Sequence, residues 1–131
     1  MNFTAKGWEH QQLMLPIDTE ILIPTDDPVR LASAQLEELD YSKLYRAYSP
    51  KGRSAAEPRI IFKVLAYGYM NGLYSSRKLE TACRKNIDFM WLLEGEPVPD
   101  RNTFARFRTG RLKDAAEDLF YQYVQKLGEM G

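Results

Sequence analysis

The chain has 131 residues, of which 44% are apolar and 27% charged, and its formal net charge is zero. This composition indicates one globular domain and excludes an intrinsically disordered chain. No apolar run approaches the ~20 residues that span a bilayer, so we expect no membrane partner. The N-terminus lacks a signal-peptide pattern, and the single cysteine, Cys83, allows no internal disulfide. Both features favour a reducing cytoplasm.

The charges are unevenly distributed along the chain. Residues 1–50 carry four Lys/Arg and eight Asp/Glu, residues 51–111 carry twelve and six, and residues 112–131 carry two and four. A basic middle segment can form a positive surface that the net charge hides, which would suit a nucleic acid. Ordinary surface charge is the alternative, and the charge distribution alone favours it.

Residues 1–26 are expected to form an extended N-terminal arm. Pro16, Pro24 and the apolar stretch 21–23 disfavour a helix there. The remaining residues, 27–131, are expected to form one helical domain.

The first expected helix follows Asp27, whose side chain suits an N-cap, and begins at Pro28, which suits the first helical position. Its apolar residues recur at helical spacing: Val29, Ala32, Leu36 and Leu39. Asp40 is expected to cap a second, short helix that contains Leu44 and Tyr45.

Three helices are expected in the middle of the chain. One begins at Pro58, ends near Gly72 and carries a single apolar stripe made of Ile61, Phe62, Leu65, Ala66 and Tyr69. The next begins at a cap provided by Ser75 or Ser76 and runs to about Lys85, with a thin stripe made of Leu79, Ala82 and Cys83. A short apolar helix over 87–93 then ends at Gly95.

Two more helices are expected in the C-terminal part of the chain. Asp100 caps a helix from Arg101 to about Thr109, and a last helix runs from about Leu112 to Leu127. The side chains expected to be buried in the last helix are Ala116, Leu119, Phe120, Tyr123, Val124 and Leu127. Short helices joined by tight turns predict an all-α fold, an orthogonal multi-helix bundle that contains a helix-turn-helix.

The helix over 101–109 has two chemically different faces. At ~100° per residue, Phe104 and Phe107 lie on one face. Nearly opposite are Arg101, Asn102, Ala105, Arg106 and Thr109. Arginine pairs with guanine, asparagine with adenine, and small side chains allow close approach to a base, so we predict that these five residues read bases in the major groove. The alternative is an amphipathic helix with a solvated arginine face, which spacing alone slightly favours.

The helix that follows Gly72 carries hydroxyl groups and cations, which bind the DNA backbone without reading sequence. Its predicted phosphate contacts are Ser75, Ser76, Arg77, Lys78, Arg84 and Lys85. Arg108 borders the core face of the later helix. We group it with the phosphate contacts, although an internal ion pair or base readout fits its position equally well. A solvated basic helix with ordinary caps is the alternative for the whole group.

No residue pattern points to catalysis. One histidine, His10, and one cysteine cannot build a zinc site. No glycine-rich phosphate loop or nucleophile motif is present. We therefore expect no catalytic residue, no metal, no cofactor and no small-molecule substrate.

Several runs resemble the N-terminal region of insertion-sequence transposases of the IS1182 type, within the IS4/IS5 group. The most specific are Asn-Gly-Leu-Tyr-Ser-Ser-Arg-Lys at 71–78 and Pro-Asp-Arg-Asn-Thr-Phe-Ala-Arg-Phe-Arg at 99–108. Phe-Met-Trp-Leu at 89–92 and Gln-Leu-Met-Leu-Pro at 12–16 also fit, in the same order along the chain.

The resemblance implies a bacterial mobile-element protein whose N-terminal domain binds the element's terminal inverted repeats. In such transposases a following RNase H-like domain holds two divalent metals on acidic ligands and cuts and joins DNA. No acidic residue of this chain matches those ligands, so we expect the catalytic domain to be missing and the chain not to be an enzyme. The expected partner is double-stranded DNA, with a homodimer possible.

The alternative function is a protein–protein module for dimerisation or synapsis. Its contact surface would be the aromatic-rich last helix, with Phe120, Tyr121 and Tyr123.

Overall fold

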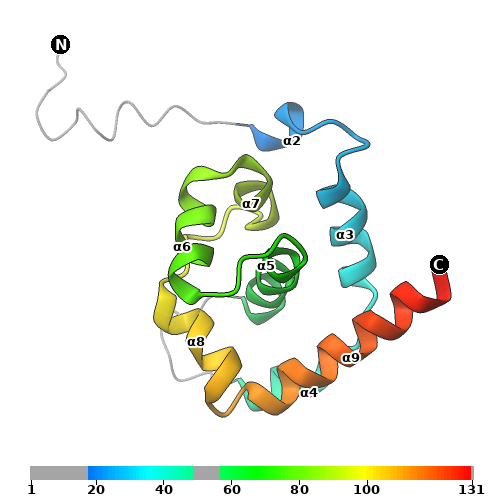
Figure 1. Cartoon of the computed structure of the whole chain (residues 1–131), viewed down its shortest axis with the longest axis vertical. Helices are drawn as coiled ribbons and strands as arrows, with labels where there is room; N and C mark the ends of the chain where they lie inside the picture. Colours follow the sequence, from blue (N-terminus) through cyan, green and yellow to red (C-terminus); the bar gives the residue numbers. More distant parts are fainter. Residues whose placement is uncertain (1–17, 49–56, 131) are drawn as a thin grey trace, which may run out of the picture.

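The computed structural model describes residues 18–48 and 57–130, and these residues form helices and connecting turns without any strand. The all-α class is therefore confirmed. The helices are α2 (Thr19–Leu22), α3 (Pro28–Glu37), α4 (Ser42–Ala47), α5 (Pro58–Met70), α6 (Ser76–Lys85), α7 (Ile87–Leu92), α8 (Arg101–Thr109) and α9 (Lys113–Met130). Figure 1 shows α5 nearly end-on in the middle, with the longer helices arranged around it.

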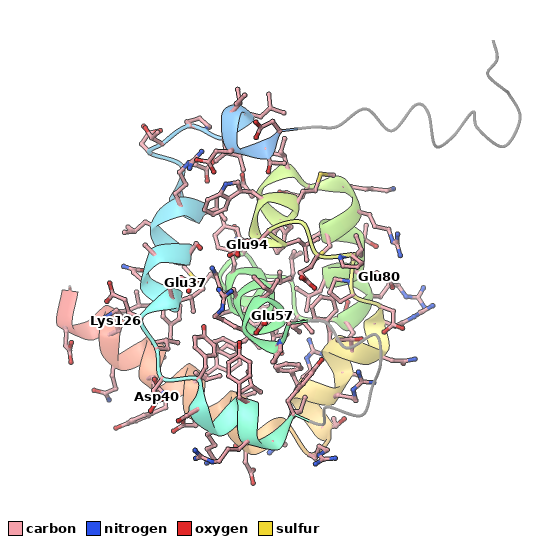
Figure 2. The ribbon with its side chains drawn as sticks, turned by 180° about the vertical axis from the view of Figure 1, so that it is seen from behind. Glu37, Asp40, Glu57, Glu80, Glu94 and Lys126 are labelled. Carbon is pink, nitrogen blue, oxygen red and sulfur yellow. The ribbon has the colours of Figure 1, made fainter. Side chains whose placement is uncertain are left out.

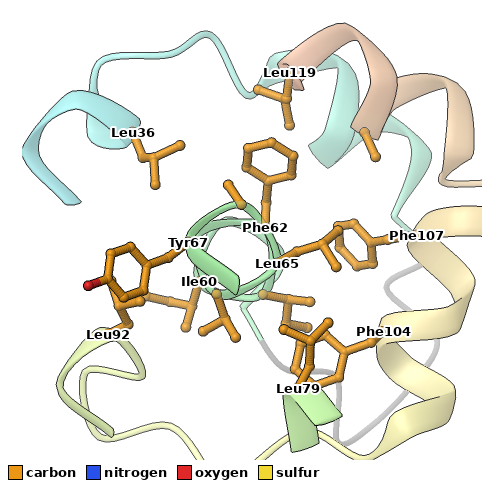
Figure 3. Packing of buried hydrophobic residues seen from close by; sticks show 14 of the residues in the cluster. Leu36, Ile60, Phe62, Leu65, Tyr67, Leu79, Leu92, Phe104, Phe107 and Leu119 are labelled. Carbon is orange, nitrogen blue, oxygen red and sulfur yellow. The ribbon is translucent and has the colours of Figure 1, made fainter. Parts of the chain in front are cut away.

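Helix α5 is the centre of the core. Every residue from Ile60 to Gly68 is buried, so the helix has no solvated face along that stretch. Figure 3 shows side chains converging on it from five other helices: Leu36 of α3, Leu79 of α6, Leu92 of α7, Phe107 of α8 and Leu119 of α9. The sequence predicted one apolar stripe on this helix. That prediction is too narrow, because partners cover α5 on all sides.

Helix ends lie where the local sequence predicts them. The Asp27 carboxylate accepts a hydrogen bond from the Val29 N–H at 2.8 Å, and Pro28 is the first residue of α3. At the end of α5, Gly72 adopts φ +80°, and the Leu73 N–H bonds the Gly68 carbonyl at 2.8 Å. This Schellman geometry needs a left-handed residue, for which glycine is the least strained choice.

Asp40 contacts the first residue of α4, but it is not the N-cap that the sequence predicted; the N-cap is Tyr41, which makes no side-chain capping bond. Its carboxylate accepts hydrogen bonds from the Ser42 N–H at 3.0 Å and from the Ser42 hydroxyl at 2.8 Å. The first of these bonds satisfies a backbone N–H of the first turn, which has no partner inside the helix.

Gly68 lets α5 and α6 approach closely. A Cβ atom built on Gly68 would lie 2.3 Å from Cδ2 of Leu79, which is itself fully buried. The position of α6 on the core therefore depends on the missing side chain at residue 68.

We expect Gly68→Ala to destabilise the fold by about 1–3 kcal/mol, because the added methyl overpacks this contact. Gly128→Ala in α9 is the matched control. No heavy atom lies within 4 Å of its added Cβ, and alanine favours a helix by about 0.5–1 kcal/mol over glycine. Chemical denaturation of both variants gives the comparison, and equal stabilities would contradict the close packing.

The expectation of an extended N-terminal segment is wrong for residues 19–22, which form the one-turn helix α2. The Asp18 carboxylate caps this turn by accepting from the Glu20 N–H at 3.0 Å. Glu20 in turn accepts a hydrogen bond from Arg30 at 2.7 Å and one from the Trp91 indole at 2.8 Å. Arg30 and Trp91 are distant from this turn in sequence. The helix propensity of residues 19–22 alone therefore could not show that the turn would be stabilised. The hydrogen bonds from Trp91 and Arg30 also hold the pKa of Glu20 below its ordinary value.

Residues 1–17 of the expected arm lie outside the described residues. The proposed boundary between an arm and a domain at residue 27 remains a prediction.

Helix α9 has core residues only as far as Tyr123. Ala116, Leu119 and Tyr123 are in the core as expected, and Phe120 is half-buried. The prediction that Val124 and Leu127 are buried is wrong, since their exposed fractions are 63% and 36%. Val124 is exposed although its neighbour Tyr123 is buried, so it lies on the solvent side of α9, and Figure 1 shows the C-terminal end of α9 extending past the other helices.

A buried cation connects α5 to two other parts of the chain. Lys63 is 1% exposed, and its Nζ atom lies 2.5 Å from a Glu37 carboxylate oxygen and 3.1 Å from one of Glu94. Arg59 pairs with the same two glutamates. Figure 2 shows Glu37 and Glu94 on the same part of the molecule. The sequence did not reveal this cluster, because its members lie far apart along the chain.

Candidate nucleic-acid interface

Helix α8 is anchored by its two phenylalanines. Phe104 is 0% exposed and Phe107 2% exposed, as predicted. In Figure 3, Phe107 points towards Leu65 of α5, and Phe104 lies beside Leu79 of α6. The opposite face of α8 is thereby fixed towards solvent.

That outer face carries the residues predicted to read bases. Arg101, Asn102, Arg106 and Thr109 are exposed, and Ala105 is half-buried. The Thr109 hydroxyl donates a hydrogen bond to the Ala105 carbonyl at 3.2 Å. Within the described part of the chain, Arg101 and Arg106 form no ion pair. The predicted exposure of these side chains is confirmed, and their role on DNA remains a prediction.

The first turn of α8 is fixed by Asp100. Its carboxylate accepts hydrogen bonds from the Thr103 N–H at 2.9 Å and from the Thr103 hydroxyl at 3.0 Å. These bonds hold the pKa of Asp100 below its ordinary value of 3.8. Because the pKa is lower in the folded protein, the cap stabilises α8 at pH values above the ordinary pKa of Asp100. This stabilisation is lost as the pH falls through the lowered pKa.

Helix α6 supplies the second group of predicted contacts. The Ser75 hydroxyl accepts from the Lys78 N–H at 3.0 Å, so Ser75 rather than Ser76 is the N-cap. The exposed cations of this helix are Arg77, Lys78, Arg84 and Lys85, and both serines are half-buried. Arg84 pairs with Glu80 of its own helix at 3.1 Å. The other three cations have no ion pair among the described residues.

The structure brings these two helices together. Helices α6 and α8 contact each other, and Figure 1 shows α8 directly below α6, on the side of the molecule opposite the C-terminal end of α9. Leu79 of α6 and Phe107 of α8 pack on α5, and most of the charged side chains of both helices are exposed. We call the exposed faces of α6 and α8 the basic surface.

Cations on the other helices mostly have acidic partners. Arg30 pairs with Glu20, Lys126 with Glu38, and Lys113 with Glu117. The exposed cations Lys43, Arg46 and Arg111 have no ion pair in the described part of the chain either, and no sequence pattern placed them in a site.

Arg108 is half-buried and has internal partners. Its Nε atom donates a hydrogen bond to the Tyr69 hydroxyl at 2.7 Å, and Nη2 donates to the Tyr74 carbonyl. Its guanidinium carbon also lies 5.5 Å from the centre of the Tyr69 ring. An internal contact was one of the alternatives for this residue, but its partners are a hydroxyl, a carbonyl and an aromatic ring rather than an acid.

The described residues do not offer a metal site, a membrane span or a reactive cysteine. They contain no group of three or more His, Cys, Asp or Glu side chains able to hold a metal ion. None of their helices is both long and apolar enough to cross a bilayer. Burial raises the pKa of the Cys83 thiol to about 12, so this cysteine stays protonated at neutral pH and lacks the reactive thiolate.

Comparison with known proteins shows the family. The sequence matches the family described as "Transposase domain (DUF772)" over residues 17–110. No curated protein and no solved structure matches the chain. The matched region extends from the start of α2 to the end of α8 and includes the whole basic surface. The chain therefore belongs to the DUF772 transposase-domain family.

Proposed function

We propose that this chain is the sequence-specific, double-stranded-DNA-binding module of a transposase, with α8 in the major groove and α6 across the phosphates. The observation that supports this most is the two-sided build of α8. Two buried phenylalanines hold the helix, while Arg101, Asn102 and Arg106 extend into solvent. In this arrangement α8 would act as the recognition helix and α6 as the helix that crosses the DNA backbone, as in a helix-turn-helix, with α7 lying between them in sequence.

The outer face of α8 has the chemistry of base readout. An arginine can donate two hydrogen bonds to guanine O6 and N7, and an asparagine can pair with adenine N6 and N7. Arg101, Asn102 and Arg106 supply these groups. Ala105 and Thr109 would let the helix approach base edges and contact a thymine methyl group.

Helix α6 suits the DNA backbone. Phosphate contacts position a protein on the duplex, and hydroxyls, cations and helix N-termini are the groups that make them. Ser75, Ser76, Arg77 and Lys78 combine all three at the start of α6, and Arg84 and Lys85 continue the basic surface at its end.

In transposition, the natural target of such a module is the terminal inverted repeat of the mobile element. This assignment follows from the resemblance to IS1182-type transposases. Cutting and joining would be carried out by an RNase H-like domain with its own metal ions, and this chain would bind without a cofactor.

The direct test is an equilibrium binding assay with labelled duplexes. Wild-type protein should bind a duplex that carries the element's terminal repeat at least about tenfold more tightly than a scrambled duplex, because specific binding generally exceeds non-specific binding by far more. Equal affinity for both duplexes would leave a general DNA-binding surface and would contradict sequence readout.

We expect Lys78→Ala to weaken binding to specific and random duplexes by a similar factor, because a phosphate contact carries no sequence information. Loss of one phosphate contact should also reduce the slope of log K against log salt by about one. Arg84→Ala should act in the same direction. The readout is a salt titration of affinity on both duplexes.

Lys126→Ala is the matched control for this prediction. Lys126 is labelled in Figure 2 on the side opposite Glu80 of α6, so its loss should leave the slope unchanged. A change in sequence preference for Lys78→Ala, with an unchanged salt slope, would contradict the assignment of α6 to the backbone.

The alternative, a dimerisation or synapsis module, is favoured by one observation. Tyr121 and Val124 of α9 are 66% and 63% exposed, and apolar side chains at such positions can support a protein contact. The contact surface predicted from the sequence needs correction. Tyr123 is buried and Phe120 is half-buried against the core, so Tyr121 is the exposed member of the three predicted residues. Sedimentation of the wild type and of Tyr121→Asp tests this alternative.

A further inference from the structure

We infer that Arg108 is a positioning residue that sets the start of α6 relative to α8, so that phosphate contacts and base contacts are made in register. This inference rests on the proposed function for its consequence on DNA. The contact itself is a property of the folded protein and can be tested without DNA.

The Arg108 side chain connects three elements. It extends from the last turn of α8, donates to the Tyr69 hydroxyl near the end of α5 at 2.7 Å, and donates to the carbonyl of Tyr74 in the turn before α6. With both Nε and Nη2 engaged inside the protein, the planar guanidinium is held in a fixed orientation.

Tyr69 is itself held firmly by neighbouring rings. It stacks on Phe120 of α9, with the ring centres 5.4 Å apart and an interplanar angle of 6°. On another side it meets Tyr74 edge-on, with the ring centres 5.9 Å apart. Arg108 therefore donates to the hydroxyl of a half-buried tyrosine whose ring is positioned at the edge of the core by packing.

The carbonyl that Arg108 binds lies in the turn immediately before α6. Tyr74 directly precedes Ser75, the N-cap whose hydroxyl accepts from the Lys78 N–H. Ser75 is the first of the residues whose hydroxyl, backbone or cationic groups are proposed to bind phosphate. A shift of the turn would move all of them relative to α8.

Base readout is more sensitive to such a shift than phosphate binding. Electrostatic contacts to phosphates tolerate small displacements, whereas bidentate hydrogen bonds to base edges require a fixed orientation of the helix. Loss of the Arg108 contacts should therefore reduce discrimination between DNA sequences more than general affinity.

Two variants separate the possible roles of this residue. Arg108→Gln removes the charge and the contacts, and Tyr69→Phe removes only the hydroxyl that Arg108 binds. Each is assayed for affinity on specific and scrambled duplexes across a salt series, at a temperature where melting curves show the variant to be folded. Amide hydrogen exchange of the free variants is measured at residues 75–79.

We expect Arg108→Gln to lower the ratio of specific to non-specific affinity on the order of tenfold, and Tyr69→Phe to lower it in the same direction. The salt slope should remain that of the wild type in both variants. In the absence of DNA, exchange at residues 75–79 should be faster than in the wild type, because the turn before α6 has lost its link to α8.

Three results would overturn the inference. A slope shallower by about one in Arg108→Gln, with Tyr69→Phe unchanged, would place Arg108 on a phosphate. If both folded variants kept the wild-type ratio of specific to non-specific affinity, Arg108 would have only a structural role. Unchanged exchange at residues 75–79 would show that it does not hold the turn. If wild-type protein itself failed to discriminate, the proposed function would fall, and the exchange data would still decide whether Arg108 holds α6.

Discussion

Phe107→Ala should lower the free energy of unfolding by about 3–5 kcal/mol, because it removes a ring that is almost fully buried and leaves a cavity between α8 and α5. A loss of this size is a large fraction of the ~5–15 kcal/mol that stabilises a typical domain. For a chain of this length the melting temperature should fall by roughly 10–20 °C. Chemical denaturation followed by circular dichroism measures the effect.

Arg106→Ala is the matched control for this variant. Residue 106 precedes Phe107 in the same helix but lies on the exposed face. Its substitution should change stability by no more than ~0.5 kcal/mol. Similar losses for the two variants would mean that α8 is not attached to the core by one face, and the argument for a free reading face would fail.

Asn102→Ala and Arg106→Ala should each weaken binding to the specific duplex by about 1–3 kcal/mol, or roughly 5- to 150-fold. The physical reason is the loss of a bidentate contact to a base edge. Their effect on a scrambled duplex should be smaller, because base contacts are not correctly formed there. Fluorescence anisotropy on both duplexes, with a thermal melt of each variant, gives the comparison.

Gln125→Ala controls for the loss of an exposed polar side chain. Gln125 lies on α9, away from the basic surface, and its substitution should leave both affinities unchanged. Should Asn102→Ala and Arg106→Ala bind the specific duplex as tightly as the wild type does, α8 is not the reading helix. The dimerisation alternative on α9 would then become the better account.

The parts of the fold that local sequence determines were predictable. Asp27 with Pro28, Gly72 and Asp100 mark helix ends through the chemistry of capping, and each does so in the structure. The two-faced pattern of residues 101–109 likewise predicted the burial of Phe104 and Phe107, because a helical repeat fixes which residues share a face.

The features that depend on distant contacts were not predictable. Helix α2 is stabilised by Arg30 and Trp91, and Lys63 is buried among glutamates from other elements. The prediction that Val124 is buried was wrong, because helical spacing alone could not show that the neighbouring helices cover Tyr123 and leave Val124 exposed. Arg108 is a similar case, since its spacing left three roles open and only the fold shows its tyrosine partners.

The most direct test of the central claim is a map of the DNA-contacting residues by NMR chemical-shift changes during titration with the terminal-repeat duplex. The account predicts the largest changes at residues 75–78 and 101–109, little change at residues 121–129, and smaller changes across 101–109 when the duplex is scrambled. Changes concentrated on α9, or equal for the two duplexes across 101–109, would contradict the claim that α8 reads DNA sequence.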